Sequence, residues 1–134
     1  MNFTIEHKEN LTFVRCNVDK LDTLNAPELK SHFLHESKQL SSHFVVDLRK
    51  VKYCDSSGLS ALLVGNRIAK EHDSQLIIFG LQPAVEKIIS ISQLDTVFNI
   101  VSTSTNMRHF KTHTFTRTIN GKFIEKGINA KAVA

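Results

Sequence analysis

Residues Val45 to Gly65, with the sequence VVDLRKVKYCDSSGLSALLVG, contain the strand-to-helix transition on which the predicted fold depends. Residues 44–46 (Phe-Val-Val) form a short apolar run rich in β-branched side chains, which is typical of a strand buried on both faces. Apolar residues gather again after the polar residues 55–58 (Asp-Ser-Ser-Gly), in a segment that can form a helix. The two serines therefore lie where a buried strand leads into a helix.

The polar residues of this turn suit two roles. Asp55, Ser56 or Ser57 can cap the helix by accepting hydrogen bonds from its first N–H groups, and Gly58 lets another backbone approach closely. A hydroxyl at this position is exposed and faces the positive end of the helix dipole, where an added phosphate would be stabilised. The turn therefore suits a phosphorylatable serine, and helix capping is the simpler alternative.

The segments before this turn predict a hairpin and a helix. Apolar residues alternate with polar ones on both sides of residues 8–10 (Lys-Glu-Asn), which predicts an antiparallel hairpin. Asn25 precedes residues 26–28 (Ala-Pro-Glu), so a helix is expected to start there with Asn25 as its cap. The expected buried stripe of this helix consists of Leu29, Phe33 and Leu34.

The segments after the turn continue the alternation of strands and helices. A helix is expected from about Ser57 to Glu71 with Leu59, Leu62, Leu63 and Ala69 inward, then a strand at Leu76–Phe79, a helix opened by Pro83, and a last strand over Val97–Val101. This order predicts an α/β fold with a mixed, mostly parallel β-sheet, entered by the antiparallel N-terminal hairpin and packed against helices.

Length and charge predict one domain with an appendage. A chain of 134 residues can bury one core of ordinary size. Residues 1–102 contain 11 Lys and Arg against 12 Asp and Glu, and residues 103–134 contain 6 against 1, so the net charge of +4 comes from the C-terminal part. We expect a domain over residues 1–110 and a basic tail over residues 111–134, either flexible or a hairpin around Asn120-Gly121. A fourth helix near residues 105–110 is a further expectation.

The sequence lacks the patterns typical of secreted, membrane-spanning and metal-binding proteins. The start of the chain has no signal-peptide pattern and no run of about 18 apolar residues occurs, so a cytoplasmic protein without membrane insertion is expected. Cys16 and Cys54 have no metal-type spacing and are expected to be reduced, partly buried thiols. His109 and His113 share a helical spacing but have no third ligand nearby, so no metal and no cofactor are expected.

Catalysis and direct nucleic-acid binding are also not expected. The turn lacks the first glycine of a Gly-x-Ser-x-Gly elbow, and no partner acid or base stands at a recognisable spacing from Asp55. The chain has no tryptophan and one tyrosine, so it lacks an aromatic platform for stacking bases, and its basic residues gather in a short tail. A binding protein, not an enzyme, is the prediction.

The segment at residues 55–59 (Asp-Ser-Ser-Gly-Leu) resembles the signature of STAS domains, and particularly of bacterial anti-sigma factor antagonists. The flanking residues 24–26 (Leu-Asn-Ala), 76–81 (Leu-Ile-Ile-Phe-Gly-Leu), 91–95 (Ile-Ser-Gln-Leu-Asp) and 97–100 (Val-Phe-Asn-Ile) also match, and the resemblance covers roughly residues 1 to 110. Cys54 departs from the family pattern, in which a larger apolar residue is usual.

The resemblance implies a function and its residues. It implies phosphorylation of Ser56 and a partner-binding surface that includes Asp55, Ser56, Ser57, Gly58, Leu59 and Asn25. The implied partners are an anti-sigma factor with serine kinase activity, which would bring its own ATP, and a serine phosphatase. By binding the anti-sigma factor, the chain would free a sigma factor. The alternative is an accessory STAS subunit or regulator of a membrane transporter, of the ABC type for lipids or for anions, in which the serine is only structural.

Overall fold

The computed structural model describes residues 1–38, 43–101, 115–117 and 123–125. Its centre is a five-stranded sheet with the strand order β1-β2-β4-β6-β7. The strands are β1 (Phe3–Lys8), β2 (Leu11–Cys16), β4 (His43–Asp47), β6 (Leu76–Phe79) and β7 (Asn99–Val101). β1 pairs with β2 in antiparallel fashion, and the other neighbours are parallel. The predicted fold class is confirmed.

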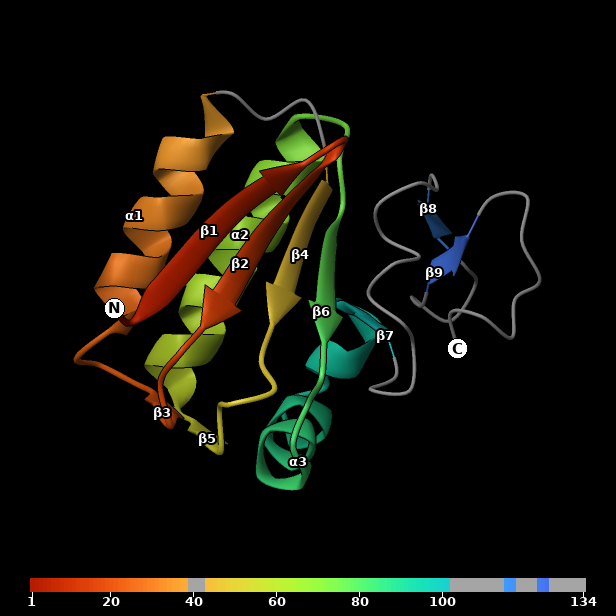
Figure 1. The fold of residues 1–134 in the computed structure, drawn as a ribbon. Helices are drawn as coiled ribbons and strands as arrows, with labels where there is room; N and C mark the ends of the chain where they lie inside the picture. The colour runs from red at the N-terminus through yellow and green to blue at the C-terminus, as the bar shows by residue number, and fades with distance from the viewer. Residues whose placement is uncertain (39–42, 102–114, 118–122, 126–134) are drawn as a thin grey trace.

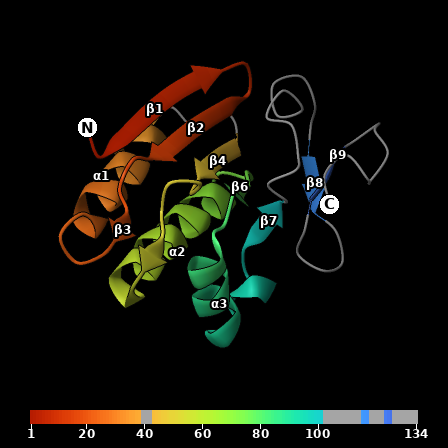
Figure 2. The same ribbon diagram turned by 60° about the horizontal axis from the view of Figure 1, so that its bottom comes forward.

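The helices lie on one face of the sheet and at one end of it. They are α1 (Ala26–Ser37), α2 (Ser56–Glu71), α3 (Pro83–Ile91) and the 3₁₀ turn η1 (Leu94–Thr96). Figure 1 looks onto the sheet with α1 and α2 behind it, and α3 lies at the end where β6 finishes. Figure 2 shows α1 and α2 on the same side of the sheet. Both of these helices begin at the end of the molecule where β3 and β5 lie.

Four short strands of the described residues lie outside the five-stranded sheet. β3 (Lys20–Leu21) pairs in parallel with β5 (Tyr53–Cys54), and β8 (Phe115–Arg117) pairs in antiparallel fashion with β9 (Phe123–Glu125). Residues 118–122, where the sequence suggested a turn around Asn120-Gly121, lie outside the described residues, so the hairpin or flexible tail stays a prediction. The β3–β5 pair was not predicted, because a strand of two residues is too short to show an alternating pattern.

The sheet is buried on both faces. One core cluster joins the helices to the sheet through β4 residues Phe44 and Val46, whereas Val45 belongs to a second cluster on the opposite face. The second cluster consists of Leu11, Phe13, Val45, Ile77, Phe79 and Val101. Since successive side chains of a strand point to opposite faces, β4 is a central strand buried on both sides, as its composition predicted.

The helix faces differ in part from the prediction. Leu29 and Phe33 of α1 are fully buried, but Leu34 is 56% exposed, so its place in the buried stripe is wrong. Seven residues after Leu29, on the same helical face, it is Glu36 that is buried, and its carboxylate contacts the ring of His7. In α2 Leu59, Leu62 and Ala69 are buried as expected, while Leu63 is only half-buried.

Two further expectations need correction. The last strand covers only residues 99–101, because η1 occupies residues 94–96 and the chain turns before pairing with β6. Cys16 and Cys54 are free thiols as expected, but both are fully buried in the core instead of partly buried. The predicted helix near residues 105–110 lies outside the described residues.

The close contact of α1 with α2 depends on the absence of a side chain at Gly65. A Cβ at this position would lie 2.7 Å from two ring carbons of Phe33 and 2.8 Å from Cδ1 of Leu76. Carbon atoms that are not bonded to each other do not approach so closely, and Gly65, Phe33 and Leu76 are all buried. We therefore expect Gly65→Ala to lower the free energy of unfolding by about 1 to 3 kcal/mol, although alanine favours helices.

This prediction is tested by urea unfolding of the two proteins. Ser31→Ala on the exposed side of α1 is the control, and we expect a change of at most about 0.5 kcal/mol. Equal or greater stability of Gly65→Ala would contradict the steric argument.

The domain boundary near residue 110 remains a prediction, and the two core clusters support it. Among the residues whose burial the structure describes, the members of both clusters lie between residues 3 and 101. We expect the chain truncated after residue 110 to keep a single cooperative transition in calorimetry, because it retains all the described members of both clusters. Loss of that transition would mean that residues 111–134 complete the core.

Candidate functional site

The β3–β5 pair holds the start of α2 against the loop before α1. The Asp55 N–H donates a hydrogen bond of 3.1 Å to the carbonyl oxygen of Leu21. A Cβ at Gly58 would lie 2.5 Å from the same Leu21 oxygen and 2.6 Å from the sulfur of Cys54. Position 58 therefore requires glycine, and the expectation that Gly58 allows a close backbone approach is confirmed.

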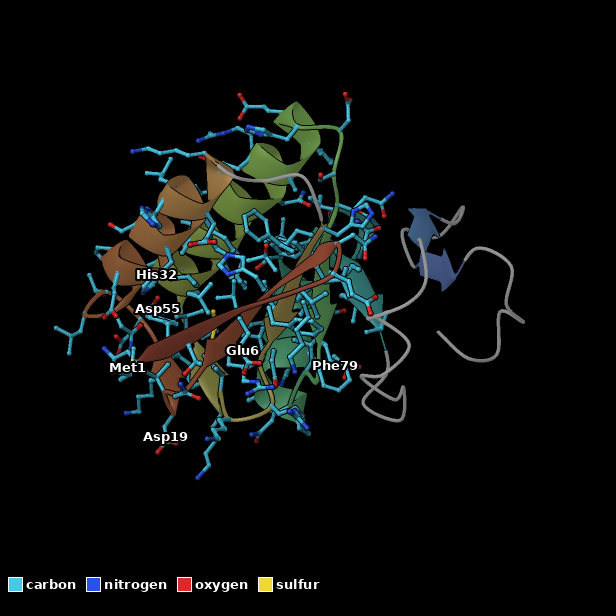
Figure 3. The ribbon with its side chains drawn as sticks, turned by 45° about the horizontal axis from the view of Figure 1, so that its top comes forward. Met1, Glu6, Asp19, His32, Asp55 and Phe79 are labelled. Atoms are coloured by element: carbon cyan, nitrogen blue, oxygen red, sulfur yellow. The ribbon has the colours of Figure 1, made fainter. Side chains whose placement is uncertain are left out.

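Asp55 is the cap of α2. Its Oδ1 accepts a 3.0 Å hydrogen bond from the Gly58 N–H, and its Oδ2 accepts a longer one, of 3.5 Å, from the Thr23 hydroxyl. The capping role that the sequence left open among three residues thus belongs to Asp55. In Figure 3 the label of Asp55 lies between those of His32, on α1, and Met1.

The two serines are left free by this arrangement. Ser56 is exposed and Ser57 is half-buried, and neither hydroxyl makes a hydrogen bond to another of the described residues. They border a hollow of about 320 Å³ between the starts of α1 and α2. The first turn of α2 contains no acidic residue. Its N–H groups that lack helical partners therefore favour a negative charge at Ser56.

Asn25 lies close to this site but does not cap α1. Its Oδ1 accepts a 3.0 Å hydrogen bond from the Asp22 N–H, and its Nδ2 donates one of 2.8 Å to the Lys20 carbonyl. The α1 start at Ala26 is confirmed, but the expected side-chain cap is wrong because the preceding loop offers Asn25 nearer partners. Glu28 likewise accepts a 3.1 Å bond from Asn2. Asn25 therefore shapes the loop that carries Thr23.

The remaining predicted residues lie below the surface. Leu59 is only 6% exposed and belongs to the main core, and Gly58 is buried. Their part in a binding surface would be to support the exposed residues above them. Sequence reasoning missed five residues that line the hollow, namely Thr23, Ala26, Pro27, Lys30 and Ser60. The first four lie far from Ser56 in sequence, and only the packing of α1 beside α2 brings them near it.

The chemistry of the site favours binding over catalysis. Burial, and to a smaller extent the charge of Asp55, raises the pKa of the Cys54 thiol to about 12, so this cysteine is neutral and not a nucleophile. Among the described residues, no group of three or more His, Cys, Asp or Glu is placed to hold a metal ion. His109 and His113 lie outside those residues.

Because Asp55 caps α2, its replacement should lower the free energy of unfolding. Asp55→Ala removes the acceptor for the Gly58 N–H, so we expect the free energy of unfolding to fall by about 1 kcal/mol. Ser57→Ala is the matched control, with an expected change of at most about 0.5 kcal/mol, because the Ser57 hydroxyl caps nothing. Chemical denaturation measures both, and an equal loss in the two variants would contradict the assignment of the cap.

Comparison with known proteins agrees with this arrangement. The family model of the STAS domain matches residues 2–107. The anti-sigma-B factor antagonist of Listeria monocytogenes is 30% identical over 107 residues, which cover 75% of this chain and 90% of that protein. No helix in the described part of the chain has the length and apolar character needed to cross a membrane.

Solved structures share the fold at low sequence identity. An anti-sigma factor antagonist (STAS) domain protein from Planctomyces limnophilus has a TM-score of 0.68 at 19% identity, covering 76% of this chain and 90% of that one. The phosphorylated form of the Bacillus cell fate determinant SpoIIAA has a TM-score of 0.59 at 17% identity, covering 73% and 89%. With the family model matching most of its length, the chain belongs to the STAS domain family.

Proposed function

We propose that this chain is an anti-sigma factor antagonist, a non-catalytic binding protein that is switched by phosphorylation of Ser56. Its partner would be an anti-sigma factor with serine kinase activity, and a serine phosphatase would reset the switch. The ATP site belongs to the kinase, and the exchange takes place in the cytoplasm. The observation that carries the proposal is the free, exposed hydroxyl of Ser56, directly after the capping carboxylate of Asp55.

The surroundings of Ser56 support a phosphate there without unfolding. Phosphorylation adds about −1.5 to −2 charges at the start of α2, where unpaired N–H groups and the helix dipole favour negative charge. Lys30 lines the same hollow as Ser56, so its ammonium group supplies a positive charge on the side where the phosphate would be added. The stability of the phosphorylated domain should therefore change little.

The same charge would weaken the complex with the partner. A surface shaped for a neutral hydroxyl beside one carboxylate would meet added bulk and charge that must be desolvated. Two unit charges at close range interact by about 4 kcal/mol at an effective dielectric constant of 20. A screened fraction of about 1.4 kcal/mol already corresponds to a tenfold loss in affinity.

The known relatives support the same function. The relatives from Listeria monocytogenes and Listeria innocua are both named anti-sigma-B factor antagonists. The structural neighbour SpoIIAA has been solved in a phosphorylated and an unphosphorylated form. These names describe regulators and not catalysts, in line with the expectation from the sequence. We place the binding surface on Asp55, Ser56, Ser57 and Asn25, with Gly58 and Leu59 beneath it.

The proposal is tested with the cognate kinase. Incubation with this kinase and ATP should add one phosphate to the wild type, measured by intact mass and mapped to Ser56. Ser56→Ala should still bind the kinase but resist modification, and Ser57→Ala should bind and be modified. Ser56→Asp should bind about tenfold more weakly, since it mimics the phosphate only in part.

Two results would overturn the switch. One is wild-type affinity of Ser56→Asp in the titration, and the other is a phosphate mapped to Ser57. If no phosphate is transferred and the chain binds a transporter ATPase or permease instead, the alternative role of an accessory subunit holds.

A further inference from the structure

A second group of polar side chains lies at the other end of α2. They line an open hollow of about 420 Å³ and consist of Asn66, Lys70, Ser74, Gln75 and Asn99. Asn66 follows Ser56 by ten residues, which is about 15 Å along the helix axis. The hollow is therefore separate from the proposed phosphorylation site, and the function proposed above does not use it.

Three of the residues that line this hollow have an amide oxygen without a hydrogen-bond partner among the described residues. These oxygens are Oδ1 of Asn66, Oε1 of Gln75 and Oδ1 of Asn99, and all three atoms are buried. Asn66 is 4% exposed and Asn99 only 2%. Buried polar atoms in native proteins almost always have a partner, because an unpaired one loses its hydration without compensation. Three such atoms belong to residues around one hollow, so a ligand that entered it with small side-chain rotations could supply the missing donors.

The fold holds these groups on separate, well-anchored elements. Asn66 projects from the second half of α2, and Asn99 begins β7, where it pairs with Ile77 of β6. The loop between α2 and β6 is fixed by the Ser74 N–H, which donates 2.7 Å to the Ala69 carbonyl. The Gln75 N–H donates 3.1 Å to Nδ1 of His43. A ligand would therefore meet a preformed set of acceptors.

The charge of the hollow narrows the class of ligand. Lys70 lines it, is exposed, and forms no ion pair with a carboxylate of the described residues. We propose that this hollow binds a small organic anion that also carries hydroxyl or amino groups, such as a hydroxy acid or an amino acid. The donors of the ligand would pair with the three amide oxygens, and its carboxylate with the ammonium group of Lys70. An anion without donors would leave the oxygens unpaired, and a neutral polyol would leave the lysine unpaired.

The binding test uses the full chain labelled with ¹⁵N and four probes. D-glycerate represents the hydroxy acids and L-serine the amino acids, acetate is an anion without donors, and glycerol has donors without charge. We expect D-glycerate or L-serine to shift the side-chain amide signals of Asn66, Gln75 and Asn99 in NMR spectra, and acetate and glycerol to leave them unchanged. Absence of shifts with both acids, or equal shifts with acetate, overturns the proposal.

Variants separate a ligand site from a packing defect. Asn66→Leu should weaken binding of the responding acid about tenfold or more, and should raise the melting temperature of the ligand-free protein, because an unpaired buried amide is replaced by an apolar group. Lys70→Met should also weaken binding about tenfold, while Lys87→Met, an exposed lysine of α3, should leave it unchanged. Unchanged binding by Asn66→Leu, or a lower melting temperature, would show that the amide serves the fold and not a ligand.

Discussion

The position of α2 depends on the close approach of Gly58 to the carbonyl oxygen of Leu21. A Cβ at residue 58 would lie 2.5 Å from that oxygen, so any other residue would push the helix away from β3. With the helix seated, the carboxylate of Asp55 can reach both the Gly58 N–H and the Thr23 hydroxyl. One glycine thus brings together the cap, the loop before α1 and the first turn that carries Ser56.

At this turn the residue that caps the helix is not the residue that we propose to be phosphorylated. Asp55 satisfies the N–H of Gly58, so the hydroxyl of Ser56 is not needed for the fold. The buried thiol of Cys54 and the core residue Leu59 lie underneath and fix the backbone on both sides of the serine. In the proposed switch, a phosphate on Ser56 would therefore change the surface that a partner meets and leave the helix cap and the core beneath it in place.

The α2 helix connects two regions of opposite design. At its start the backbone donors are free and a cation, Lys30, is near, whereas in its second half Asn66 presents a buried acceptor. Between them the helix is clamped to α1, because Gly65 admits the ring of Phe33 at close range.

The sequence by itself determined the elements with strong periodicity and the turn at residues 55–58. The apolar run of β4, the alternation in the N-terminal hairpin and the strand-to-helix order all report local preferences that tertiary packing did not override. The sequence also placed the serine hydroxyls at the start of a helix and identified Asp55 as one of the candidate caps. These features depend on residues close together in the chain, and so they could be predicted.

Only the tertiary structure decided which side chains meet across the chain. Asn25 bonds its own loop instead of capping α1, and Lys30 reaches the hollow of Ser56 through the packing of α1 beside α2. The pairing of β3 with β5, which joins the two loops, covers too few residues to leave a sequence pattern. The exposure of Leu34 and the convergence of Asn66 with Asn99 follow from how the helices rotate onto the sheet. Contacts between residues distant in sequence depend on that packing, which no local pattern records.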